Sequence, residues 1–236
     1  MRSVPVLHRG VSRLRGRRIH DPNCKLRDVH LGTAYGGWSV DTHRLDASSI
    51  IYSIGVGEDV SFDLALIDKL NCIVHAFDPT PISVNWIAKQ NLPPNFVFHD
   101  VGIAAKDGEV EFHLPPIKGF HSFSISAHPE ASQTGTIKCP VLTLSSVMRQ
   151  LGHRHVDLLK IDIEGFEYQV IDNIIASNIR PDILLIEFHH MSYGIARTET
   201  LRTVDNLRRY GYKIYYVSNV GAEYGFVDGI LHEPLK

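Results

Sequence analysis

The sequence predicts an α/β fold: a mostly parallel, Rossmann-like sheet with helices on both faces and an antiparallel edge. The runs 50–54, 72–77 and 183–186 consist mainly of apolar and β-branched residues, as strands covered on both faces do. Segments with helical spacing of apolar residues lie between such runs, which is the alternation typical of a parallel sheet. The turn Gly55-Val56-Gly57 directly follows the first run, as in nucleotide-binding folds.

The composition predicts one medium-sized globular domain. The chain has 236 residues, of which 44% are hydrophobic and 21% charged. Residues 1–46 show little periodicity and are expected to form an N-terminal extension, which leaves residues 47–236 as the main domain. The aromatic residues of Tyr35-Gly36-Gly37-Trp38 are expected to anchor this extension to the core, with a lid over a ligand as the alternative.

The overall charge gives no argument for a polyanionic partner, because the formal net charge is −2 and the pI is about 6.7. We therefore expect no nucleic-acid partner. Arginines are nevertheless concentrated near the N-terminus, which predicts a solvated arm or, alternatively, a contact with an anionic partner. They are Arg2, Arg9, Arg13, Arg15, Arg17 and Arg18.

Cysteine usage and hydropathy bear on the cellular location. Cys24, Cys72 and Cys139 are far apart and form no CxxC pair, so we expect neither a disulfide framework nor a cysteine-ligated zinc site. No run approaches the roughly 18 apolar residues of a membrane span, and the N-terminus has no apolar signal-peptide core. A cytoplasmic protein without a membrane span is the expectation.

Residues 50–80 have the pattern of one strand–helix–strand nucleotide-binding unit. After the glycine turn, apolar residues recur at helical spacing, and the second strand ends at Asp78-Pro79. Asp78 follows Gly57 by about 20 residues, the offset expected of a ribose-binding carboxylate. The unit therefore predicts a cofactor that contains a nucleoside.

The charge of the turn indicates which cofactor fits. Glu58 and Asp59 stand where the pyrophosphate of a dinucleotide would meet the helix N-terminus, and their negative charge would repel it. S-adenosylmethionine (SAM) has a ribose diol and a cationic head but no phosphate, so it suits this turn better. Asp59 or Ser61 also fits the simpler role of a helix cap.

The next strand, 96–99, follows a helix expected over 82–90 and places Asp100-Val101 at its C-terminal end, where open α/β sheets bind ligands. Asp100 is expected to accept a hydrogen bond from the adenine amino group; a turn-forming aspartate is the alternative. Asp107-Gly108 predicts a hairpin between the segments 101–104 and 109–114.

The segment 115–140 has no regular pattern and is rich in Pro, Ser, His and Gly. A long irregular segment inside a compact domain is usually functional, so we expect it to face an acceptor substrate. Its candidate contacts are His121, Ser122, Ser124 and His128.

The remaining chain continues the α/β alternation. We expect helices over 144–151, 166–175 and 198–210, strands over 156–161, 183–186 and 212–217, and a last edge strand over 225–227.

Two of these later strands end in ionisable residues that should face one crevice. Asp162 and Glu164 follow the strand 156–161, and Glu187 and His189 follow the strand 183–186. His189 is the natural base for removing a hydroxyl proton, because an unperturbed imidazole titrates near neutrality. Asp162 is the carboxylate alternative, and a merely structural, hydrogen-bonded histidine is the other interpretation of His189.

The same crevice has the ligand types of a divalent-ion site. Asp162, Glu187 and His189 offer oxygen and nitrogen atoms that suit Mg²⁺ or Mn²⁺. A carboxylate before a helix is also an ordinary cap, so we predict no metal site.

From about Ile50 to Tyr216 the chain resembles the FkbM family of SAM-dependent methyltransferases. The resemblance rests on the GVG turn, FDPTP, the expected hairpin, LLIEFHH and above all LLKIDIEGFE. It implies a class I methyltransferase sheet and methyl transfer to a hydroxyl oxygen. It also implies two groups of site residues: Gly55, Gly57, Asp78 and Asp100, with the adjoining Pro79 and Val101, at SAM, and Asp162, Glu164 and Glu187 at the reacting end.

The sequence departs from the commoner family pattern at two positions. Ser53 stands where an acidic residue often contacts the methionine amino group, and Glu58 stands where a smaller residue is common. The contacts to the amino-acid end of SAM are therefore open.

Two other classes of protein share these features. An NAD-dependent oxidoreductase would have the same unit and Asp78, although Glu58 and Asp59 oppose its pyrophosphate. A non-catalytic SAM-binding protein would tolerate Ser53. If the chain is a methyltransferase, its acceptor is expected to be a hydroxylated small molecule, a sugar or glycan, or a natural product.

Overall fold

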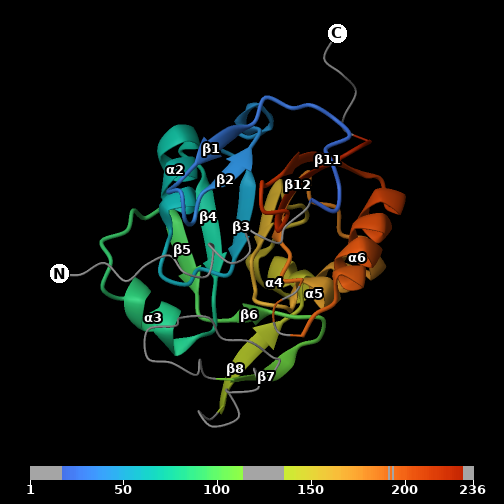
Figure 1. Ribbon diagram of the computed structural model, residues 1–236. Helices are drawn as coiled ribbons and strands as arrows, with labels where there is room; N and C mark the ends of the chain where they lie inside the picture. The colour runs from blue at the N-terminus through green and yellow to red at the C-terminus, as the bar shows by residue number, and fades with distance from the viewer. Residues whose placement is uncertain (1–17, 114–135, 191, 193, 231–236) are drawn as a thin grey trace, which may run out of the picture.

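A central seven-stranded sheet organises the molecule (Figure 1). The computed structural model describes residues 18–113, 136–190, 192 and 194–230. The sheet has the order β11-β12-β10-β9-β3-β4-β5, in which β12 alone runs in the direction opposite to the other six strands. The strands are β3 (Ile50–Ile54), β4 (Ile73–Phe77), β5 (Phe96–His99), β9 (Leu158–Ile161), β10 (Ile183–Glu187), β11 (Tyr212–Val217) and β12 (Glu223–Asp228). The predicted mostly parallel α/β sheet is confirmed.

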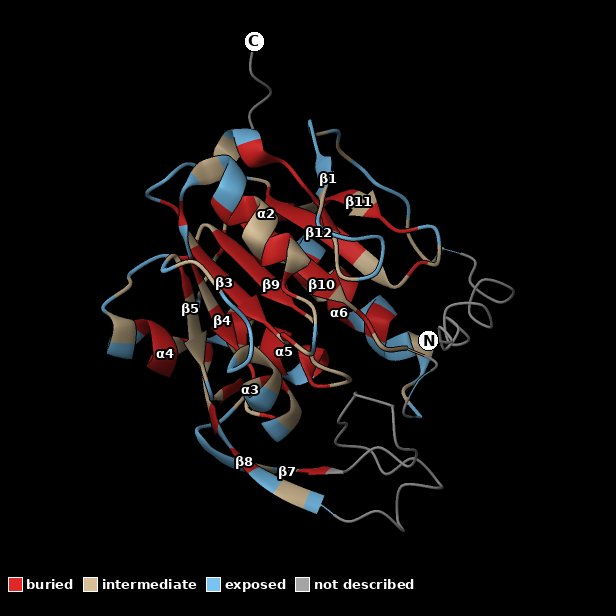
Figure 2. Ribbon diagram, turned by 90° about the vertical axis from the view of Figure 1, so that its left-hand side faces the viewer, coloured by how far each residue is buried: buried red, intermediate tan, exposed pale blue. Residues whose placement is uncertain are grey.

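Helices cover both faces of this sheet (Figures 1 and 2). One face packs against α4 (Leu144–Leu151), α5 (Glu167–Ala176) and α6 (Arg197–Arg209). The other packs against α2 (Ser61–Leu70), α3 (Pro81–Ile87) and the N-terminal strands β1 (Val29–Leu31) and β2 (Trp38–Val40). The central strands are buried on both sides, which explains their nearly continuous apolar sequences.

Local chemistry sets the helix boundaries. Thr80 and Thr143 cap α3 and α4 by accepting hydrogen bonds from Ser83 N and Ser146 N. Asn71, in the left-handed conformation with φ 55°, ends α2. These residues therefore fix where α2 ends and where α3 and α4 begin.

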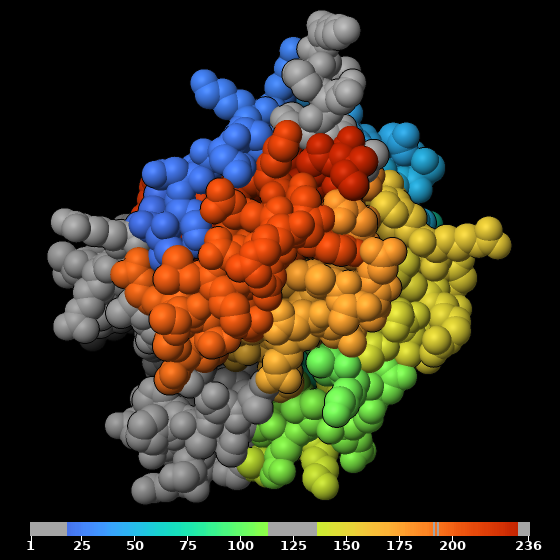
Figure 3. Space-filling model, turned by 90° about the vertical axis from the view of Figure 1, so that its right-hand side faces the viewer, coloured from blue at the N-terminus to red at the C-terminus, as the bar shows by residue number. Residues whose placement is uncertain are grey.

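The described part of the N-terminal extension packs on the main core. Trp38 is buried, whereas Tyr35 is 73% exposed at the turn between β1 and β2, so Trp38 is the aromatic anchor. The backbone N–H groups of Asn23 and Cys24 donate to the carbonyl of Ile214 in β11. Figure 3 shows this N-terminal segment, in blue, beside the orange and red C-terminal part of the chain. The short 3-10 helix η1 (Thr42–Arg44) ends this segment, and the chain then enters β3 at Ile50.

The hairpin predicted at Asp107-Gly108 is wrong. Strand β6 (Gly102–Ile103) pairs in parallel with β8 (Thr136–Leu142), and β7 (Gly108–His113) pairs antiparallel with β8 on its other side. Asp107 does not close a hairpin, because its carboxylate accepts hydrogen bonds from Thr143 N at 2.6 Å and Ser146 Oγ at 2.7 Å. A strand distant in sequence therefore separates the two expected partners.

Two further expectations need correction. The strand predicted over 225–227 is not an edge strand, because β12 lies between β10 and β11. Residues 136–140 of the expected irregular segment belong to β8. His121, Ser122, Ser124 and His128 lie outside the described residues.

Within the described ranges, no helix has both the length and the apolar character needed to cross a membrane.

Candidate active site

The glycine turn after β3 lies directly against the end of β9. Gly55 has φ +85°, and a Cβ placed on it would come within 1.7 Å of the Asp162 carbonyl oxygen. Only glycine permits that approach. Gly57 has φ +57°, and a Cβ placed there would meet no atom within 4 Å. The turn is therefore closed toward Asp162 and open above Gly57.

Asp78, at the C-terminal end of β4, holds the turn in this shape. Its Oδ2 accepts hydrogen bonds from Val56 N at 3.0 Å and Gly57 N at 3.1 Å. Its Oδ1 accepts from Thr80 N at 2.9 Å and Thr80 Oγ1 at 2.6 Å. Asp78, the carboxylate predicted to bind the cofactor, is thus buried and hydrogen-bonded to the glycine turn that is also predicted to bind it.

The other candidates of this half lie around the same strand ends. Pro79 packs against Gly102, where an added Cβ would be 2.9 Å from Pro79 Cγ. Asp100 is exposed after β5, and Val101 beside it is half-buried. Glu58 is exposed on the turn. Pro79 therefore follows β4, Asp100 and Val101 follow β5, and Glu58 lies on the turn after β3.

Asp59 lies immediately before Val60, the N-cap residue of α2, and its carboxylate binds the first residue of the helix. Its Oδ1 accepts from Ser61 N at 2.7 Å, and its Oδ2 accepts from Thr33 Oγ1 at 2.9 Å. A carboxylate of the protein therefore occupies the anion-binding end of this helix.

Ser53 lies beneath the turn and away from its open side. It is fully buried, and its Oγ has no hydrogen-bond partner among the described residues. Its neighbour at i−2, Ile51, belongs to the layer under α2, so Ser53 faces the same layer.

The ends of β9 and β10 bring together the four predicted reacting residues. His189 Nε2 lies 3.2 Å from Glu164 Oε2 and 3.8 Å from Asp162 Oδ1. Glu164 has φ 51°, an uncommon left-handed conformation for a residue other than glycine, next to Gly165 with φ 105°. Glu187 ends β10 beside this group.

Glu167 joins this cluster, although the sequence-based candidates did not include it. The residue is fully buried at the beginning of α5. Its Oε1 accepts from His189 N at 2.8 Å and lies 3.3 Å from His189 Nδ1, and its Oε2 accepts from Gly165 N at 2.8 Å. Its position in LLKIDIEGFE was the available signal, because that phrase carries the reacting carboxylates.

Three residues of the cluster, His189, Glu187 and Asp162, have raised pKa values. Burial by itself would lower the pKa of His189, but Glu164 and Glu167 reverse this effect and raise that pKa well above its ordinary value. Burial, reinforced by Asp162, raises the pKa of Glu187 to about 8. Burial also raises the pKa of Asp162. The protonated form of His189 is therefore favoured, and the carboxyl groups of Asp162 and Glu187 titrate at a higher pH than usual.

Ligand atoms of Asp162, Glu187 and His189 lie within 4.8 Å of one another. That spacing suits a divalent ion, although the imidazolium already supplies positive charge to the same carboxylates.

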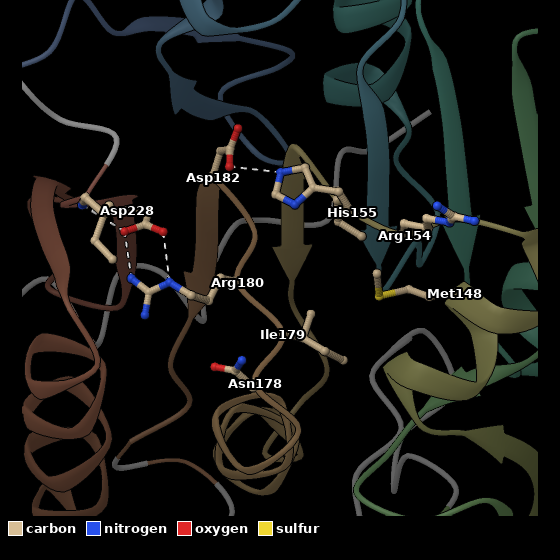
Figure 4. A pocket seen from close by; sticks show the side chains of 10 residues that line it. Met148, Arg154, His155, Asn178, Ile179, Arg180, Asp182 and Asp228 are labelled. Atoms are coloured by element: carbon tan, nitrogen blue, oxygen red, sulfur yellow. Dashed lines mark hydrogen bonds and ion pairs between the residues drawn. The ribbon is translucent and has the colours of Figure 1, made fainter.

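A separate pocket of about 410 Å³ lies at the opposite edge of the sheet, where β9 and β10 begin (Figure 4). Its charged side chains are largely paired: Arg180 with Asp228 at 2.7 Å, and His155 with Asp182 at 2.9 Å. The reacting residues follow the other ends of these strands, so this pocket is not the candidate active site.

The strand order, the antiparallel β12 and the glycine turn facing an acidic cluster define the class I methyltransferase fold. The chain belongs to the FkbM methyltransferase family, because the "Methyltransferase FkbM domain" matches residues 49–214. The resemblance carried by LLKIDIEGFE is thereby confirmed.

Similar proteins carry related names. "Probable methyltransferase-like protein 24" of Homo sapiens and of Rattus norvegicus are each 27% identical over 142 residues, which cover 59% of this chain and 32% of the relative. The match thus spans about a third of the length of these curated relatives. The crystal structure of "Methyltransferase FkbM" from Methylobacillus flagellatus aligns with a TM-score of 0.51 and 14% identity, over 78% of this chain and 44% of that one. It shows a shared fold.

Proposed function

We propose that this chain transfers a methyl group from SAM to a hydroxyl oxygen of a small molecule, sugar or natural product. The observation that carries the proposal is the contact between Gly55 and Asp162, because it puts the cofactor turn directly against the acidic cluster. A methyl donor on the turn and an acceptor at the cluster would then be neighbours, and such positioning lowers a barrier by several kcal/mol.

The chemistry of the turn fits SAM. The open space above Gly57 leaves room for a ligand on the backbone. The Asp59 carboxylate at the N-terminus of α2 occupies the place of a pyrophosphate and disfavours a dinucleotide. Gly55, Gly57 and Asp78 would hold the nucleoside, with Pro79, Asp100 and Val101 around the adenine.

Asp78 has a role that its hydrogen bonds define. A carboxylate offers about four lone-pair sites, and Asp78 already accepts four hydrogen bonds from the turn and from Thr80. Asp78 therefore shapes the turn, and a ribose hydroxyl would bind it by replacing one of these bonds.

When bound, SAM supplies an electrophilic methyl group on sulfur, and the protein must take the hydroxyl proton. Glu187 is the favoured acceptor of that proton when it is in its carboxylate form, because a pKa of about 8 makes this carboxylate a stronger base than an ordinary one. Asp162 shares this role from the end of β9. His189, protonated by contact with Glu164 and Glu167, orients these carboxylates and balances their charge.

A divalent ion, Mg²⁺ or Mn²⁺, on Asp162, Glu187 and His189 is the alternative way to activate the hydroxyl. An added chelator distinguishes the two. Unchanged activity supports the carboxylate base, and a loss that Mg²⁺ or Mn²⁺ restores supports the ion.

The proposal is tested by calorimetric titration of the whole chain with SAM and with NAD. We expect SAM to bind and NAD to bind weakly or not at all; the reverse result contradicts the proposal and supports an oxidoreductase. Asp78→Ala should weaken SAM binding, whereas Asp205→Ala on the exposed side of α6 should leave it unchanged.

Formation of S-adenosylhomocysteine with a panel of hydroxylated acceptors separates an enzyme from a SAM-binding protein without catalysis. Product formation that is lost in Glu187→Gln supports the proposed base. Tight SAM binding with no turnover of any acceptor supports the binding protein.

A further inference from the structure

Lys160 is a buried cation in the middle of the central strand β9. It is 6% exposed and lies between the buried residues Leu159 and Ile161. Burying an ammonium group is costly unless the group is paired and hydrogen-bonded. Its Nζ donates to the Gly55 carbonyl at 2.6 Å and lies 3.9 Å from Asp162 Oδ2. One side chain thus joins the turn after β3 to the acid after β9.

A buried carboxylate lies in the same layer. Asp63, on α2, is 2% exposed, and its Oδ1 has no hydrogen-bond partner among the described residues. Ser53 is the direct neighbour of Lys160 across β3 and β9, and its side chain lies beside Asp63, whose pKa it helps to lower. An ammonium group has three N–H donors. Burial raises the pKa of Asp63, and the charge of Lys160 opposes this rise, so Lys160 is the cation that favours the charged form of this carboxyl group.

Trp38 closes the layer from outside. Lys160 Nζ lies 5.9 Å from the centre of the Trp38 ring, which is itself buried. This distance is within the range of a cation–π contact, and the ring shields the charges from solvent. The N-terminal extension therefore covers the buried charged groups beneath the turn.

We infer that Lys160 is a positioning residue: it fixes the Gly55 carbonyl, and with it the cofactor turn, relative to Asp162, with Asp63 as its buried counter-charge. Stability alone does not explain this arrangement, because replacing a buried ion pair with uncharged residues is often neutral or stabilising. The inference rests on the proposed SAM site and assigns its geometry to residues that do not touch the cofactor.

Four variants of the whole chain test the inference: Lys160→Met, Asp63→Asn, the double variant of both, and Lys69→Met, an exposed residue of α2, as the control. Lys160→Met should weaken SAM binding by about tenfold to a hundredfold, the effect of losing one hydrogen bond from a charged group. Lys160→Met should also unfold at a lower temperature, because it leaves Asp63 buried without a cation.

The double variant separates positioning from folding. Removing both charges should restore the unfolding temperature, while SAM binding stays weak and amide hydrogen exchange at Val56 and Gly57 becomes faster, because the Gly55 carbonyl has lost its donor. Lys69→Met should match the unaltered chain in all three measurements. SAM affinity at the unaltered level in the double variant, or in folded Lys160→Met, would overturn the inference. Failure of the unaltered chain to bind SAM would instead refute the proposed function, and the positioning role with it.

Discussion

The Glu167 carboxylate connects the two loops of the candidate active site by accepting a hydrogen bond from His189 N at 2.8 Å and one from Gly165 N at 2.8 Å. The same group lies 3.3 Å from His189 Nδ1. Because Glu167 is fully buried, its charge acts on the imidazole with little solvent screening. Glu167 therefore holds the backbone of His189 in place and, together with Glu164, raises the pKa of its imidazole.

Glu167→Gln should lower the pKa of His189, because it removes a buried negative charge beside the ring. The glutamine amide has only one oxygen, so it can no longer accept from both backbone N–H groups as the two carboxylate oxygens do. The variant should therefore also lose about 1–3 kcal/mol of stability. NMR titration of the imidazole and denaturant unfolding measure the two effects. Glu199→Gln, in an exposed ion pair with Arg202 on α6, is the control and should change stability by less than about 1 kcal/mol. An unchanged His189 pKa in Glu167→Gln would contradict the assignment.

Replacing the two glycines of the turn by alanine should have different effects: one variant should lose stability and the other should lose cofactor binding. Gly55→Ala puts a methyl group 1.7 Å from the Asp162 carbonyl oxygen, so the turn or the end of β9 must move and the chain should be strongly destabilised. Gly57→Ala meets no atom and costs only about 1–2 kcal/mol for its left-handed conformation, yet its methyl group would occupy the space assigned to the cofactor. Urea unfolding and SAM titration of both variants provide the comparison. A stable Gly57→Ala variant that binds SAM normally would show that the cofactor lies elsewhere.

Glu187 should make stability depend on pH. Burial raises its pKa from 4.5 to about 8, so the folded state holds a proton that the unfolded state releases. Its contribution is fully present below about pH 4.5 and is lost as the pH rises toward about 8. Glu187→Gln should therefore gain stability relative to the unaltered chain as the pH rises through this window. Unfolding free energies across these pH values are the measurement, and parallel curves for the two proteins would exclude the raised pKa.

A histidine cluster beside β3 should produce the opposite dependence. His75 Nδ1 lies 3.1 Å from His99 Nε2, and the Tyr52 hydroxyl lies 2.7 Å from His153 Nδ1. Burial, with smaller contributions from His99 and His153, lowers the pKa of His75 from 6.5 to about 4. The unfolded chain therefore binds the proton more readily, and stability falls as the pH drops from about 6.5 toward about 4.

His75→Gln removes this group and should lose less stability on acidification than the unaltered chain. His43→Gln, at an exposed histidine, is the matched control and should follow the unaltered chain. Thermal unfolding between these pH values measures the difference. Identical acid sensitivity in His75→Gln would assign the effect to other groups.

The sequence alone determined the parts of this protein that depend on local patterns. Apolar runs and helical spacing fixed the strands and helices of the α/β sheet, and the residues after 54, 77, 161 and 187 could be grouped because parallel strands end at one edge. For the same reason Asp162, Glu164, Glu187 and His189 were placed together correctly. LLKIDIEGFE then identified the family.

The tertiary structure decided what distant segments do to one another. Strand β8 separates β6 from β7, and β12 lies inside the sheet, because strand pairing depends on contacts that no local pattern specifies. Lys160 and Asp63 interrupt apolar stretches in the sequence, yet only the packing of β2, α2 and β9 shows that their charges share one buried layer. The pKa of His189 likewise depends on carboxylates from another loop. Charge interactions act across space and not along the chain, so the electrostatics of this site became visible only in the folded molecule.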